Sequence, residues 1–189
     1  VQSGVLDLAG WDPEQDKRIK LDGEWEFYWD QLLTPDSFRQ QGADKPSPSA
    51  YMKVPSGWGG TVIHGQRLPA RGEATYRIVL RNVPIEGVFG LKKTNIWFSS
   101  VIYVDGQRLL EDGKPAGEEA AYRSGNKPQI GFFHTDQGDD IEIIIQVANY
   151  DYMNAGIPAS IYFGEQAAIA DSQQRALAYG ISIIAVLAA

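Results

Sequence analysis

The chain has 189 residues and a net charge of −7 at pH 7. This length fits one large domain or two small ones, and we expect one. Lys and Arg are scattered rather than clustered, which excludes the electrostatic footprint of a nucleic-acid-binding protein. There is no cysteine, so a disulfide scaffold and a thiolate metal site are excluded too.

Strand signals dominate the chain from its start. The segments concerned are rich in β-branched and aromatic residues and are bounded by Gly, Pro, Asn or Asp. Tyr76, Ile78 and Leu80 fall on one face of their strand. Arg77 and the residues two positions before and after it fall on the other face. The expected strands are 17–21, 24–30, 74–81, 96–105, 130–134, 141–149 and 159–163.

Two local patterns refine this outline. Asp105-Gly106 lies between residues 102–104 (IYV) and 107–110 (QRLL) and predicts a tight hairpin, because both residues tolerate a positive φ. Helical patterns are confined to a short piece around residues 29–40 and to the C-terminal run, and residues 42–50 read as an exposed loop. Alternating strands joined by turns predict an all-β fold, an antiparallel β-sandwich of jelly-roll type, rather than a parallel α/β sheet.

The C-terminal run, residues 176–189 (ALAYGISIIAVLAA), carries no charge. It is too short to cross a bilayer, which takes about 20 apolar residues. The polar residues 171–175 before it are typical of a helix start. We interpret residues 1–170 as a globular domain and residues 171–189 as the truncated start of a transmembrane helix. The alternative is a C-terminal helix that packs on the core or on a partner.

Six short motifs follow one another in order along most of the chain. With them, the sequence resembles the galactose-binding-like jelly-roll domain that precedes the catalytic barrel in β-glucuronidases and β-galactosidases. Where that family commonly has Asn-Gly, this chain has Asp105-Gly106, which keeps the turn. The motifs are 21–27 (LDGEWEF), Val54-Pro55 with Trp58, 74–77 (ATYR), 103–106 (YVDG), Gly113 and 143–149 (IIIQVAN).

Residues 27–29 (FYW), residues 72–77 (GEATYR) and the apolar end resemble a particular offshoot more closely. This is the extracellular sensor domain of bacterial seven-transmembrane receptors with diverse intracellular signalling modules. The resemblance implies a ligand-sensing, carbohydrate-binding domain outside the cytoplasm, anchored in the membrane through the segment after Gln174. A homodimer is one arrangement open to such a receptor.

Catalysis is not expected. A retaining glycosidase needs two carboxyl groups about 5–5.5 Å apart in a cleft, and Glu24 and Glu26 are the one pair that alternation places on a shared strand face. The same alternation puts Trp25 and Phe27 on the opposite face, so a solvated strand face above an aromatic core explains the pair. A catalytic barrel has no room in this length.

No cofactor is expected either. His64 and His134 are the only histidines and lack the spacing of a zinc motif. Asp136, Asp139 and Asp140 could offer oxygen ligands to a structural calcium ion. A turn that leads into the strand 141–149 explains these carboxylates as well, so calcium stays an alternative.

A bound sugar would stack its apolar face on aromatic rings and direct its hydroxyls at planar polar groups. Loop aromatics next to glycines suit the first role, and polar residues at strand ends and in loops suit the second. A loop anchor is the alternative for the tryptophan, and an ion pair for the strand arginine. The candidate ligand-binding residues are Trp58, Arg77, Arg123, Asn149, Asp151 and Tyr152.

Two other functions stay open: a protein-interaction or dimerisation module without a small ligand, and a non-catalytic sugar-binding domain of a glycoside hydrolase. An exposed aromatic cleft with converging polar groups would favour ligand binding. A buried Trp58 and an ion-paired Arg77 would favour the interaction module.

Overall fold

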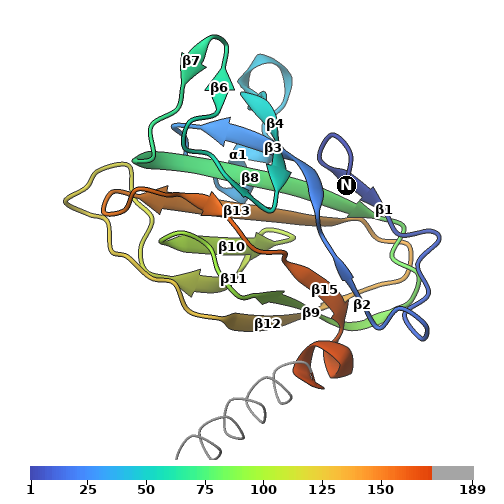
Figure 1. Ribbon diagram of the computed structural model, residues 1–189. Helices are drawn as coiled ribbons and strands as arrows, with labels where there is room; N and C mark the ends of the chain where they lie inside the picture. Colours follow the sequence, from blue (N-terminus) through green and yellow to red (C-terminus); the bar gives the residue numbers. More distant parts are fainter. Residues whose placement is uncertain (172–189) are drawn as a thin grey trace, which may run out of the picture.

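The computed structural model describes residues 1–171, and the fold is an all-β sandwich as expected (Figure 1). The larger sheet has seven strands in the order β11-β10-β13-β8-β3-β4, with β1 pairing with β8 in parallel. The other pairings in this sheet are antiparallel. Its strands are β1 (Val5–Asp7), β3 (Gly23–Trp29), β4 (Ala50–Val54), β8 (Gly72–Arg81), β10 (Ser100–Val104), β11 (Gln107–Asp112) and β13 (Ile141–Asn149).

The second sheet is antiparallel and has four strands in the order β12-β9-β15-β2. Its strands are β2 (Arg18–Lys20), β9 (Gly87–Lys93), β12 (Gln129–Thr135) and β15 (Tyr162–Glu165). Two small pairs complete the fold: β5 (Ser56–Gly57) with β14 (Gly156–Ile157), and β6 (Val62–Ile63) with β7 (Gln66–Arg67).

The core lies between the two sheets and is built by strand alternation. Tyr76, Ile78 and Leu80 of β8 are fully buried, as their period of two predicts. The same alternation in β13 buries every second side chain from Ile141 to Val147 against them. Trp25 and Phe27 of β3 join this cluster, and Phe27 packs edge-on against Tyr76 with ring centroids 5.0 Å apart.

The outer face of the seven-stranded sheet is partly covered by the short helix α1 (Pro35–Arg39). Phe38 of this helix packs edge-on against Tyr28, and Ile144 of β13 is buried with them in a second small cluster. The helix is shorter than the helical pattern at residues 29–40 suggests. Trp29 ends β3 and Asp30 takes a positive φ of 58°, so the chain turns before the helix can start.

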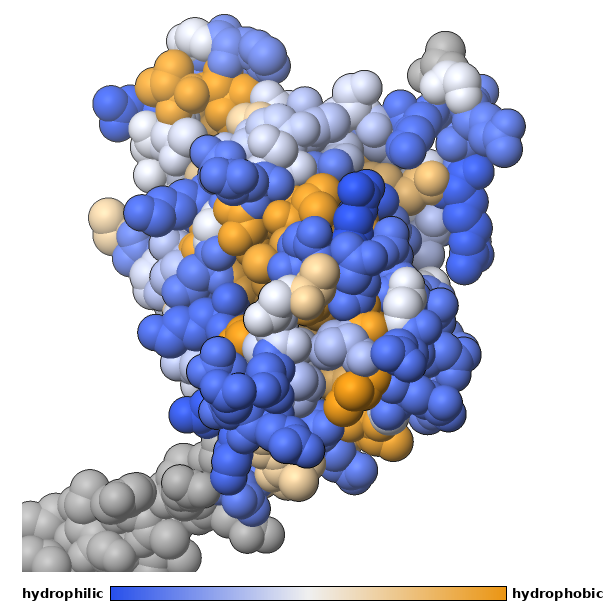
Figure 2. All heavy atoms as spheres, turned by 90° about the vertical axis from the view of Figure 1, so that its right-hand side faces the viewer, coloured by the Kyte–Doolittle hydropathy of each residue, from blue (hydrophilic) through white to orange (hydrophobic). Residues whose placement is uncertain are grey.

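Some hydrophobic residues reach the surface. Figure 2 faces the right-hand side of Figure 1, and orange residues gather in the middle of that face among hydrophilic ones. Val88 and Phe132 belong to the four-stranded sheet, and Tyr152 and Met153 follow β13. The large hydrophobic side chains that are exposed are Tyr51, Val62, Ile85, Val88, Phe132, Tyr152 and Met153.

Residues 166–171 are helical and follow β15 directly, and Ile169 is fully buried. Within residues 1–171, no helix is long and apolar enough to cross a membrane. The apolar run 176–189, which we interpret as the start of a membrane helix, lies outside the described residues.

Candidate functional site

The loops that follow β13 and precede β8 meet at one end of the sandwich, on the left in Figure 1. Asn149, the last residue of β13, is fully buried and connects them. Its Nδ2 donates to the carbonyl oxygens of Ala70 at 3.0 Å and Tyr152 at 2.8 Å, and its Oδ1 accepts from the Tyr152 amide at 3.1 Å. All the polar atoms of this side chain are therefore committed to holding the two loops together.

The two loops enclose an open hollow of about 320 Å³. Tyr152 and Met153 are exposed by 45% and 90%, so the hollow presents large apolar groups to solvent. Arg71 and Asp151 are exposed beside them and bring one positive and one negative group to the same rim. The residues that line the hollow are Pro69, Ala70, Arg71, Asp151, Tyr152 and Met153.

An aromatic stack supports the Tyr152 side of the hollow. The ring of Tyr152 lies on Phe98, with centroids 3.8 Å apart and an interplanar angle of 27°. Phe98 in turn stacks near Trp97, with centroids 6.1 Å apart. Trp97 and Phe98 are only partly buried. The stack restricts the Tyr152 ring and keeps aromatic surface at the rim, which is the arrangement that stacking on a ligand requires.

Trp58 lies beneath this rim, where no part of its ring is exposed. Its Nε1 donates to the carbonyl oxygen of Pro69 at 3.1 Å, and its ring packs edge-on against Trp29 at 5.6 Å. A sugar cannot stack on a ring without an exposed face, so the ligand-stacking role suggested for Trp58 does not fit its position. Trp58 anchors the loop that carries Pro69, which is the alternative given for it above.

A second polar cluster lies beside β8. The hydroxyl of Tyr150 donates to Glu73 Oε2 at 3.3 Å, and the ring of Tyr122 packs edge-on against Tyr150 at 5.4 Å. Burial raises the pKa of the Glu73 carboxyl. Burial and the nearby Glu73 charge raise the pKa of Tyr150 to about 12, and burial raises that of Tyr122 to about 12. Both phenols are therefore neutral near pH 7.

Arg123 belongs to the loop that carries Tyr122, and it is exposed. Its Nη1 donates to the carbonyl oxygens of Tyr122 at 2.7 Å and Ala120 at 3.3 Å. Its backbone also pairs with Lys114 in an isolated bridge. Arg123 closes its own loop and does not line the hollow.

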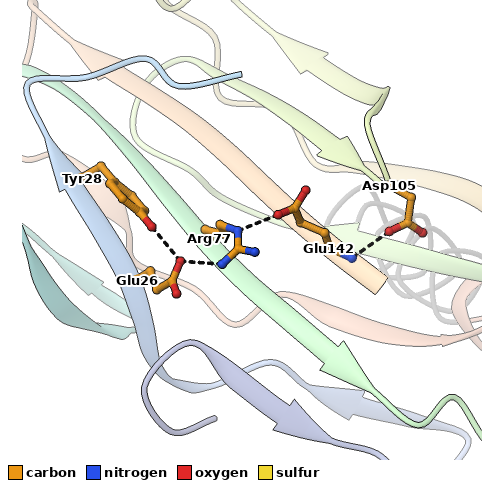
Figure 3. A network of polar contacts seen from close by, with 5 residues as sticks. All are labelled: Glu26, Tyr28, Arg77, Asp105 and Glu142. Carbon is orange, nitrogen blue, oxygen red and sulfur yellow. Dashed lines mark hydrogen bonds and ion pairs between the residues drawn. The ribbon is translucent and has the colours of Figure 1, made fainter. Parts of the chain in front are cut away.

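Arg77 lies on the outer face of the seven-stranded sheet, pointing away from the Tyr76 face as alternation predicts (Figure 3). Its Nη1 donates to Glu26 Oε2 at 2.8 Å and its Nε donates to Glu142 Oε1 at 2.6 Å. Tyr28 donates its hydroxyl to the same Glu26 oxygen at 2.8 Å. Arg77 is thus ion-paired on both sides.

The contacts of Arg77 are those of a structural ion-pair network. Burial lowers the pKa of the Arg77 guanidinium, but Glu26 and Glu142 more than offset this and the pKa is raised. The guanidinium also lies 5.0 Å from the ring centroid of Phe38 in α1, which covers it. The ligand role suggested for Arg77 does not fit these contacts, and the ion-pair alternative does.

Glu24 and Glu26 are held by different groups. Glu26 is held by Tyr28 and Arg77, while Glu24 is exposed and accepts from the Ser3 amide at 3.4 Å. Neither residue lines the hollow between residues 69–71 and 151–153.

Of the six residues singled out in the sequence, Asp151 and Tyr152 line the hollow, and the buried Asn149 holds its two loops together. Sequence reasoning missed Arg71, Met153 and the Trp97-Phe98 pair. The sequence feature that could have pointed to these residues is their position next to strand ends. Arg71 directly precedes β8, and Trp97-Phe98 shortly precede β10. Only the pairing of Asn149 with Gly72 shows that these ends coincide.

No protein-family model matches the chain, and no curated protein matches it. Solved structures do match. A GH2 β-galacturonidase from Eisenbergiella tayi bound to galacturonate is similar over 78% of this chain, with a TM-score of 0.53 and 14% identity. The Ruminococcus gnavus β-glucuronidase is similar over 77%, with a TM-score of 0.56 and 14% identity. The chain spans only 24% and 27% of those two chains, so the likeness shows a shared β-sandwich fold.

Proposed function

We propose that this chain is a non-catalytic carbohydrate-binding domain whose ligand lies in the hollow between the loops at residues 69–71 and 151–153. The observation that carries the proposal is the exposed Tyr152 ring, braced by Phe98, beside the charged groups of Arg71 and Asp151. Sugars combine apolar C–H faces with many hydroxyls, and this rim offers a partner for each.

The ligand class follows from the charges. Asp151 can accept hydrogen bonds from sugar hydroxyls, while Arg71 can donate to ring oxygens or pair with a carboxylate in a bidentate way. Arg71 therefore favours a sugar with an acid group, such as a uronic acid. The fold likeness to enzymes that act on uronic acids by their names, one of them bound to galacturonate, supports testing this class first.

We further propose that the domain is the extracytoplasmic input of a membrane-anchored bacterial receptor, attached through the segment after Gln174. The support is the sequence resemblance described above and the uncharged run at residues 176–189. In such a receptor, ligand binding shifts a population between two states, and only a difference in affinity for those states can transmit a signal. Fractionation of cells that carry the protein, followed with an antibody against residues 1–171, tests the membrane attachment: the domain is found in the membrane fraction if the proposal holds, and in the soluble fraction if it does not.

The binding proposal is tested by a thermal-shift screen of the 189-residue chain against neutral sugars and uronic acids. A ligand that binds only the folded state, at 100 times its dissociation constant, stabilises it by about 2.7 kcal/mol, which raises Tm by roughly 5 to 10 °C for a chain of this size. Tyr152→Ala and Arg71→Ala should each abolish most of this shift.

Tyr51→Ala is the matched control, because Tyr51 is 49% exposed, close to the exposure of Tyr152, but lies in β4 away from the hollow. A shift that survives Tyr152→Ala and Arg71→Ala would place the ligand elsewhere. The absence of any shift on folded protein would overturn the sugar-binding proposal.

The second candidate function is a protein-interaction or dimerisation module. Two observations favour it: Trp58 is buried and Arg77 is ion-paired, which are the conditions named above for this function. Met153, at 90% exposure, would then be an interface residue. Sedimentation analysis of the chain and of Met153→Asp distinguishes the two, because only an interface at this rim makes self-association depend on Met153.

A further inference from the structure

We propose that Glu86, His134 and Asp136 form a binding site for a divalent transition metal such as Zn²⁺, on the outer face of the four-stranded sheet. The register of β9 and β12 brings them together. His134 pairs with Val88, and Thr135 pairs with Gly87. One step further along the same antiparallel register, Asp136 stands opposite Glu86.

Strand alternation puts all three side chains on one face. Phe89 and Leu91 of β9 point into the core, so the even-numbered residues of this strand point outward. In β12, His134 lies two residues before Asp136 and therefore shares its face. The site is thus fixed by two neighbouring strand ends rather than by a long loop.

The distances suit a metal ion. One potential ligand atom from each of the three residues lies within 4.8 Å of the others, and Glu86 Oε1 is 3.8 Å from His134 Nε2. Ligands about 2.1 Å from a tetrahedral zinc ion lie roughly 3.4 Å from one another. All three side chains are exposed, so small rotations close this difference without moving the backbone.

The charges favour a cation there. Glu86 and Asp136 face each other across two strands, and carboxylates in that position repel. Within residues 1–171, no Lys or Arg lies within 4.0 Å of either carboxylate, and the basic side chain beside Glu86 is His134. A bound cation would remove this repulsion.

The ligand set selects the kind of metal. One imidazole and two carboxylates suit zinc and its first-row neighbours, whereas calcium prefers oxygen ligands throughout. The calcium alternative considered from the sequence needs Asp139 and Asp140 as well. In the structure Asp140 lies 3.8 Å from Arg81, and neither aspartate joins the cluster. Three protein ligands leave at least one coordination position for water or another group.

The test is calorimetric titration of the untagged 189-residue chain with Zn²⁺, with Co²⁺ as a spectroscopic probe of the coordinating groups. We expect one saturable site. His134→Ala and Glu86→Gln should each weaken the affinity for zinc by at least about 10-fold, because the loss of a group that merely supports a metal ligand already costs about that much. His64→Asn is the control, because it removes the other histidine. The proposal is overturned if zinc does not bind, if His134→Ala binds as well as the parent chain, or if His64→Asn abolishes binding.

A gain of affinity gives an independent check. Val88 is opposite His134 in the register, two residues from Glu86 on the same face, and 41% exposed. V88H should therefore add a fourth ligand and tighten zinc binding by at least about 10-fold. V88Q changes polarity without adding a strong ligand and should leave the affinity unchanged. Equal affinity of V88H and V88Q would contradict the placement of the site.

Discussion

Lys93 of β9 and Asp112 of β11 form an ion pair of 2.7 Å that joins the two sheets in the protein interior. Their side chains are exposed by only 1% and 5%. Lys93 Nζ also donates to the carbonyl oxygen of Lys127 at 2.8 Å, and the amide of Lys127 donates to the same carboxylate at 2.5 Å. Burial lowers the pKa of Lys93, which shows that the charge is costly to keep there.

Removal of one partner of this pair should be strongly destabilising, because it leaves the other charge buried alone. We expect Lys93→Met and Asp112→Leu each to lower the free energy of unfolding by about 3–5 kcal/mol, and the double variant to lose less than the sum. Urea unfolding measures this. The control is Arg81→Met, which breaks the exposed Arg81–Asp140 pair and should cost less than about 1 kcal/mol. Additive losses in the double variant would contradict the expected coupling.

Arg77 should matter for stability and not for ligand binding. Arg77→Met leaves Glu26 and Glu142 without their shared donor and should cost about 1–3 kcal/mol in urea unfolding, while Arg77→Lys keeps the charge and recovers part of it. The affinity for any sugar that the chain binds should stay the same in Arg77→Lys. A loss of affinity without a loss of stability would instead make Arg77 a ligand residue.

Asn149 should be required for the shape of the hollow. Asn149→Asp keeps the size of the side chain but replaces the donor to the Ala70 and Tyr152 carbonyls with an acceptor, which should cost about 1–3 kcal/mol. Amide hydrogen exchange should become faster at residues 150–153, while that of β8 and β13 changes only through global stability. Unchanged exchange in this loop would show that the hydrogen bonds of Asn149 do not hold the loop in place.

Stability should fall at high pH through Tyr150 and Tyr122. The unfolded chain releases these phenol protons near pH 10.0, whereas the folded chain holds them to about pH 12. Between these values the unfolded state binds fewer protons, so the free energy of unfolding decreases as pH rises; below pH 10 the contribution is fully present. Tyrosinate absorbance of the native protein measures the titration, and Tyr150→Phe should remove one late-titrating phenol. Titration of every phenol near pH 10 in folded protein would refute this.

The strands with clear alternation could be read from the sequence. Residues 74–81 and 141–149 form β8 and β13 with the buried faces that their apolar periods predict. The hairpin at Asp105-Gly106 also forms, and both residues take the positive φ that the turn requires, 47° and 83°. In these segments local chemistry and tertiary packing agree.

β9 could not be read in this way. Its sequence, GVFGLKK, contains two glycines and two lysines, which weaken any strand signal. In the fold, Gly90 leaves the space that Phe132 fills, since a Cβ there would lie 2.9 Å from the Phe132 ring. Lys93 is buried because Asp112 lies across the sandwich. Both explanations rest on residues distant in sequence.

Only part of the candidate site could be predicted from the sequence, because the rest depends on residues that are distant in sequence. Asn149 ends a strong strand and Tyr152 follows it, so their place at a strand end was readable from the sequence. That Arg71 and Phe98 join Tyr152 depends on which strands pair, which the composition of a loop does not encode. Trp58 was singled out because it lies beside glycines, but it is buried. Its indole N–H can be buried because the carbonyl oxygen of Pro69 accepts a hydrogen bond from it.

The pairing of β8 with β13 affects the order in which the chain can fold during synthesis. Ile141 pairs with Leu80 and Asn149 pairs with Gly72, so β8 is synthesised well before the strand that pairs with it. Until then the apolar face of β8 and its free edge are open to other chains. Folding of this sandwich should therefore be slow compared with helical proteins of the same size, and a nascent chain that stalls before β13 is complete is the species most prone to aggregate.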